Sequence, residues 1–163
     1  AMEDYFTGDL GWTDLNNTSG SVDVAGLRIN AFGVGDAHHD DDRLDLVPGM
    51  VERLREDGST SSVLTIGVAH APYRRVLDSF TEAGAEAIFA GHTHGGQVRL
   101  PGFGALVANC DIPLKQARGL STWSTNGRAV PLNVSAGLGH SIYAPVRFAC
   151  RPEATLVTLI SRV

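Results

Sequence analysis

Apolar residues alternate with polar ones near the start of the chain and gather further on into short continuous runs. Two alternating segments, residues 21–24 and 27–32, flank a turn at residues 25–26 and predict a β-hairpin. The run over residues 62–69 is almost entirely apolar, and residues 85–90 form a second, shorter run. Such runs are typical of strands that helices bury on both faces, so we expect them to form the middle of a β-sheet.

Two segments between these runs carry the spacing of amphipathic helices. Pro48 suits the first turn of a helix that ends at Gly58, and Pro72 can start a second helix that closes at Gly84. The order strand, helix, strand over residues 62–90 predicts a parallel pair of strands. The carboxyl ends of these two strands are therefore expected to meet at one edge of the sheet.

The rest of the chain changes to short strands separated by glycine-containing turns. Strands are expected at residues 97–100, 105–108, 119–123, 130–134 and 154–160. Together these elements predict an α/β fold, a mixed β-sheet with flanking helices. The 163 residues are enough for one core, and we expect a single domain over residues 1–163.

The composition indicates which class of binding partner the chain favours. The apolar share of 43% and the charged share of 19% are ordinary for a globular domain. A net charge of -5 offers no basic surface for the phosphates of a long nucleic acid, so a small substrate is favoured. Cys110 and Cys150 are isolated, without the spacing of a zinc site, and are interpreted as buried reduced thiols.

Three histidines stand at the predicted ends of the two apolar runs. His70 follows the first run, and His92 and His94 follow the second within Gly91-His92-Thr93-His94. Side chains two residues apart in an extended segment point to the same face, and the glycines let the backbone bend around an ion. A single histidine is more often an ordinary surface residue, but the combination favours a metal site made by His70, His92 and His94.

The same residues resemble a known family. Gly91-His92-Thr93-His94 is similar to the Gly-His-x-His signature of the calcineurin-like metallophosphoesterase superfamily, and His70-Ala71-Pro72 resembles the upstream single histidine of its bacterial phosphohydrolase branch. Further similar segments are residues 12–15, 33–38, 95–101, 135–139 and 147–153, so the resemblance covers about residues 12–161. It implies a fold like the C-terminal half of the metallophosphoesterase α/β sandwich, in a chain that is the C-terminal part of a longer enzyme.

The resemblance also implies a function. It suggests a phosphoesterase in which two divalent metal ions, of manganese, iron or zinc, activate a water molecule that attacks phosphorus. His70 and His92 would bind one ion and His94 the other. The implied substrate is a phosphorylated small molecule or lipid. The implied location is the cytoplasm, with membrane association through an upstream segment.

The chain departs from the family pattern in one important respect. The other family motifs, Asp-x-His, Gly-Asp-x-x-Asp and Gly-Asn-His-Asp/Glu, would lie upstream, and the sequence contains no Asn-His dipeptide. A two-metal centre normally needs an anionic bridge, and three neutral imidazoles provide none. We therefore assign no catalytic residue within this chain and expect it to be inactive alone. A homo-oligomer is expected to cover the face that the missing half leaves open.

Several neighbouring residues remain open to interpretation. Asp36-Ala37-His38 has the form of the family's Asp-x-His motif, but we interpret it as a loop near the site and not as a set of primary ligands. The roles of Asp36, His38, His39 and His140 stay undecided. Two alternatives to the phosphoesterase remain. One is a non-catalytic domain for binding or assembly, and the other is a different metalloenzyme that uses His38, His39 or the acidic run of residues 40–42 with His92 and His94.

Overall fold

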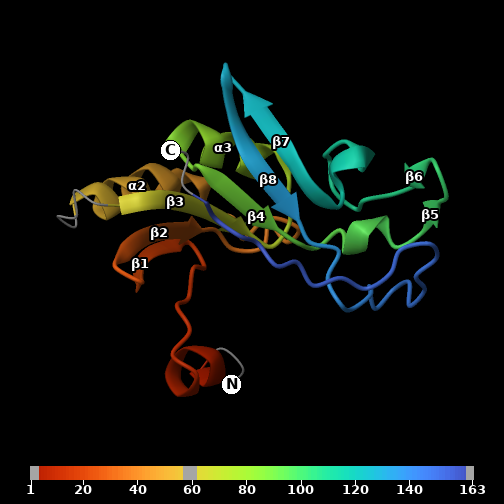
Figure 1. Cartoon of the computed structure of the whole chain (residues 1–163), viewed down its shortest axis with the longest axis horizontal. Helices are drawn as coiled ribbons and strands as arrows, with labels where there is room; N and C mark the ends of the chain where they lie inside the picture. The colour runs from red at the N-terminus through yellow and green to blue at the C-terminus, as the bar shows by residue number, and fades with distance from the viewer. Residues whose placement is uncertain (1–3, 57–61, 161–163) are drawn as a thin grey trace.

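A computed structural model describes residues 4–56 and 62–160, and a six-stranded mixed sheet lies at its centre (Figure 1). The strand order is β1-β2-β3-β4-β8-β7. The four middle strands are parallel, and each outer strand is antiparallel to its neighbour. The strands are β1 (Thr18–Val24), β2 (Leu27–Gly33), β3 (Ser62–Ala69), β4 (Ala87–Ala90), β7 (Gly119–Thr125) and β8 (Arg128–Val134). The predicted α/β class with a mixed sheet is confirmed.

Two α-helices pack on the same face of this sheet (Figure 1). Helix α2 (Val47–Glu56) contacts β1 and β2, and helix α3 (Arg74–Ala83) contacts β7 and β8. The core between helices and sheet contains the fully buried side chains of Phe32, Met50, Phe80, Ile88 and Leu132. Shorter helical turns are η1 (Tyr5–Asp9), η2 (Leu44–Leu46), η3 (His94–Gly96) and η4 (Leu114–Gln116).

Several predicted boundaries are confirmed. The hairpin of β1 and β2 forms with a continuous antiparallel register, and β3 and β4 are parallel. Gly84 ends α3 in the left-handed conformation, with φ of 105°, which glycine adopts without steric cost. Helix α3 begins at Arg74 and not at Pro72, because Tyr73 is still extended. The predicted end of α2 at Gly58 lies outside the described residues.

The prediction that helices bury both faces of the middle strands is wrong. Both α2 and α3 lie on one face, and on the other face Leu64, Ile66 and Val68 of β3 remain only half-buried. An apolar run indicates that its side chains are stabilised by burial away from water, but it does not determine whether a helix or another segment buries them. This leaves one face of the sheet partly open.

The predicted last strand is also wrong. Residues 154–160 are described without strand structure, although they are rich in the β-branched residues that are typical of strands. Residues 155–159 run across the open face beside β4, β7 and β8, with a gap of about 440 Å³ between them and the sheet. Because β4 and β8 already pair with neighbours on both sides, a segment that crosses their face finds no ladder partner.

Two other predicted strands are shorter than expected. Within residues 97–100 only Arg99–Leu100 form a strand, β5. In place of the strand predicted at residues 105–108 there is β6 (Gly104–Ala105), which begins one residue earlier and is two residues long. These two form a small separate sheet beside the main one. No helix within residues 4–56 and 62–160 has the length and apolar character needed to cross a membrane.

Candidate functional site

His70 and His92 meet at the carboxyl ends of two neighbouring parallel strands. His70 directly follows β3, and His92 comes two residues after β4. Nδ1 of His92 lies 3.2 Å from Nε2 of His70, and the ring centroids are 5.0 Å apart. Parallel pairing thus brings together two of the three histidines that the sequence singles out.

The separation of these two nitrogens suits a shared metal ion. Imidazole nitrogens bind zinc at about 2.0–2.1 Å, so two of them in a tetrahedral site lie about 3.3 Å apart. The observed 3.2 Å is close to this value, and it also suits a hydrogen bond from one ring to the other. Burial lowers the pKa of His92, and the hydrogen bond to Asn109 opposes this effect only in part. The lowered pKa favours the neutral ring, which is the form that binds a metal.

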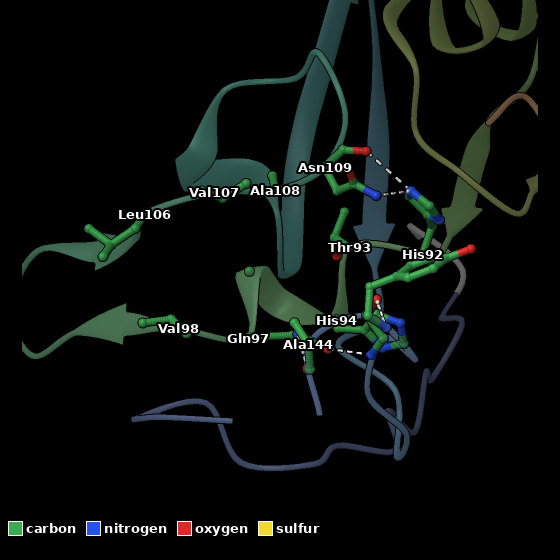
Figure 2. A pocket seen from close by; sticks show the side chains of 13 residues that line it. His92, Thr93, His94, Gln97, Val98, Leu106, Val107, Ala108, Asn109 and Ala144 are labelled. Carbon is green, nitrogen blue, oxygen red and sulfur yellow. Dashed lines mark hydrogen bonds between the residues drawn. The ribbon is translucent and has the colours of Figure 1, made fainter. Parts of the chain in front are cut away.

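Asn109 fixes the orientation of the His92 ring (Figure 2). Nε2 of His92 lies 3.1 Å from the carbonyl oxygen of Asn109 and 3.3 Å from its Nδ2. If Nε2 carries the proton and donates to the carbonyl, the lone pair on Nδ1 points to His70. Ligand histidines in proteins are commonly oriented in this way. Sequence reasoning missed Asn109, whose left-handed φ of 51° is a conformation that asparagine tolerates.

His94 does not join the pair, and the expectation that it shares a face with His92 is wrong. His92 and His94 have left-handed φ values of 64° and 50°, and Thr93 between them is helical, so the segment is not extended. In Figure 2 the ring of His92 reaches towards Asn109 while His94 is turned away from it. Side chains two residues apart point to the same face only where the backbone is extended, and the prediction for His92 and His94 assumed an extended backbone.

The surroundings of His94 belong to a different part of the chain. Burial and the positive charge of Arg147 lower its pKa, while a hydrogen bond with the carbonyl of Gly139 opposes this effect. Its own carbonyl oxygen accepts a hydrogen bond from Sγ of Cys150 at 3.3 Å. The lowered pKa favours the neutral ring of His94, which faces the loop after β8.

The loop after β2 also reaches the histidine pair. Oδ2 of Asp36 lies 3.8 Å from Nε2 of His70 and 2.9 Å from Nδ1 of His39. Burial alone would raise the pKa of Asp36, but bonds to the backbone of His38 and the ring of His39 lower it below its ordinary value. The ring of His38 lies 4.6 Å from that of His92. An ionised carboxylate and the ring of His38 thus lie beside the pair, and His39 is bound to that carboxylate.

The described residues form only part of a metal site. Within residues 4–56 and 62–160, no three histidine, cysteine or acidic side chains are grouped so that they could hold an ion. The donor chemistry of His70 and His92 fits one divalent ion, with Asp36 close by, and His94 lies apart. Cys110 and Cys150 are free thiols, half-buried and buried respectively. Burial raises the pKa of Cys110, which disfavours the thiolate that a metal would need.

A pocket of about 410 Å³ opens beside His92 and His94 (Figure 2). We call it the side pocket, and it is lined by His92, Thr93, His94, Gly96, Gln97, Val98, Leu106, Val107, Ala108, Asn109, Ser141, Tyr143 and Ala144. Gly96 is needed in its wall, because a Cβ there would lie 2.6 Å from the carbonyl oxygen of Val107. The volume is in the range of small-molecule sites.

Comparison with known proteins gives no relative for this chain. No protein-family model matches it, and no curated protein or solved structure matches it either. The functional assignment therefore depends on the residues of the site and on the sequence patterns that led to them.

Proposed function

We propose that this chain contributes imidazole ligands to the metal centre of a phosphoesterase, a hydrolase that acts on phosphate ester bonds. The observation that carries the proposal is the 3.2 Å separation between Nδ1 of His92 and Nε2 of His70 at the ends of parallel strands. The resemblance of residues 91–94 to the metallophosphoesterase signature supports the same assignment. In this proposal the mixed sheet corresponds to the C-terminal half of that family's sandwich.

Each residue of the site would have a separate role in binding the metal ions. His70 and His92 would hold one ion, of manganese, iron or zinc, with the carbonyl of Asn109 keeping the ring of His92 in place. A divalent ion at such a position supplies activation of water and polarisation of the phosphate. Ionised Asp36 offsets positive charge near His70. His94 is assigned to a second ion, which would be bound by the ring nitrogen that is not bonded to the carbonyl of Gly139.

The donor set also predicts low activity for this chain by itself. Two neutral imidazoles leave the charge of a dication uncompensated, and sites with two protein ligands bind zinc or manganese weakly. A bridging carboxylate is expected to come from polypeptide other than the described residues. Substrates would be phosphorylated small molecules or lipids.

The proposal is tested by metal uptake. Because a site with two protein ligands is weak, equilibrium dialysis is carried out against manganese or zinc in large excess, and the bound metal is expected to approach about one ion per chain. Loss of one ligand commonly weakens metal affinity at least tenfold, so His70→Ala and His92→Ala should each do so. His140→Ala is the matched control, because the ring of His140 is exposed and its Nδ1 lies 3.0 Å from the carbonyl oxygen of Ser141. Uptake that is absent, or equal in all variants, would contradict the proposal.

A non-catalytic domain for binding or assembly is the second candidate. It is favoured by the absence of a three-residue ligand group within the described part of the chain. The same dialysis separates the two candidates, because an assembly domain would take up no metal. Hydrolysis of an aryl phosphodiester with added manganese would then also be absent.

A further inference from the structure

The side pocket has a polar end and an apolar end. Figure 2 shows His92 and Asn109 at one end and Val98 and Leu106 at the other. The polar end adjoins the pair of imidazoles, so a ligand that lies along the pocket would have one part at the histidines and the rest among apolar side chains. The two ends are continuous in one cavity of about 410 Å³.

The apolar end is lined by apolar side chains that are exposed to solvent. Val98, Leu106 and Val107 are 40%, 43% and 64% exposed. Large apolar side chains gathered at one hollow often mark a ligand groove, because covering them removes apolar surface from water. A ligand with an apolar group would gain from this burial.

Two polar side chains of the lining already have partners within the protein. Nε2 of Gln97 donates to the carbonyl of Ala144 at 2.9 Å, and Oε1 of Gln97 accepts from the backbone N–H of Ser141. Oγ1 of Thr93 donates to the carbonyl of Ala117 at 2.7 Å. A polar ligand group in the apolar end would lose its hydrogen bonds to water and would gain none from Gln97 or Thr93. The binding of such a group there is therefore disfavoured.

We infer that the side pocket binds a compact apolar group, an aryl ring or a short alkyl chain, of an ester whose phosphate lies at His92 and His94. This inference rests on the proposed phosphoesterase function and adds the class of substrate to it. The phosphate is recognised at the histidine end, and the apolar group selects among phosphate esters by burial against Val98, Leu106 and Val107.

The test compares two non-hydrolysable probes, phenylphosphonate and methylphosphonate, with the chain in millimolar manganese. Isothermal titration calorimetry is expected to show the phenyl compound binding about tenfold more tightly, from the extra apolar surface it buries. Val107→Glu should reduce this preference to near unity, since Val107 is 64% exposed and the change leaves the core intact. The matched control is Val24→Glu, at a side chain 51% exposed on β1 outside the side pocket.

The outcomes separate this inference from the function on which it rests. A phenyl preference that is lost in Val107→Glu and kept in Val24→Glu supports the inference. Equal affinity for both probes in a chain that takes up manganese overturns the inference and leaves the proposed function intact. Absence of manganese uptake together with absence of phosphonate binding overturns both.

Discussion

Thr93, between the two histidines of the Gly-His-x-His segment, holds that segment in place. Its side chain is 3% exposed, and Oγ1 donates to the carbonyl of Ala117 while accepting from the backbone N–H of Gly95 at 3.2 Å. These bonds tie the turn that carries both histidines to η4. The residue therefore acts on the site through the backbone, as a positioning residue, and not as a ligand.

Thr93→Val tests this role. Valine fills the same space but leaves the buried carbonyl of Ala117 without its donor, so the free energy of unfolding should fall by about 1–3 kcal/mol. Urea unfolding measures the loss, and manganese dialysis should show weaker uptake because His92 is less well placed. Thr122→Val, at an exposed position of β7, is the control and should change both quantities little. An equal loss in the two variants would argue against a special role for Thr93.

At the scale of elements, the contact of β3 with α3 requires glycine at position 67. A Cβ on Gly67 would lie 2.5 Å from Cδ2 of Phe80. The ring of Phe80 is fully buried and packs edge-on against Phe32, with centroids 4.8 Å apart, so it has little freedom to move away. Strand β3, which His70 directly follows, is thus positioned by a close approach to the helix that covers it.

Gly67→Ala is expected to lower the free energy of unfolding by about 1–3 kcal/mol, as overpacking of a core does. Chemical denaturation measures the effect, and Gly8→Ala is the control, because a Cβ at Gly8 meets no atom within 4 Å. If the clash is with the ring, the cost should shrink in a Phe80→Leu background. A cost that is unchanged in that background would show that the contact with Phe80 is not its cause.

At the scale of the whole molecule, one face of the sheet is incompletely covered. Leu156 and Ile160, in the segment that crosses this face, are 93% and 85% exposed, and Leu120 of β7 is 77% exposed. Exposed apolar side chains of this size on one side of a sheet tend to be covered by another chain. This supports the expectation of a homo-oligomer.

Sedimentation equilibrium over a range of concentrations is expected to show reversible association. Leu156→Glu should shift the equilibrium to the monomer, because a charge at a dry contact is costly to bury. Phe103→Glu, at a side chain 78% exposed in the turn between β5 and β6, is the control. A monomer at every concentration would contradict the expectation.

Local patterns in the sequence determined much of the sheet and part of the site. The alternation and the apolar runs predicted the hairpin, β3, β4 and the end of α3 at Gly84, because these depend on residues that are neighbours in the chain. Parallel pairing then made His70 and His92 adjacent. The sequence by itself thus determined which strand ends carry the candidate ligands.

Only the tertiary structure decided how these parts combine. It placed Asp36 beside His70, turned His94 away through two left-handed residues, and set both α-helices on one face of the sheet. It also left residues 154–160 without a ladder partner and formed the side pocket from segments distant in sequence. The physical reason is that periodicity records which side chains avoid water, whereas their partners depend on backbone turns and on contacts between distant segments.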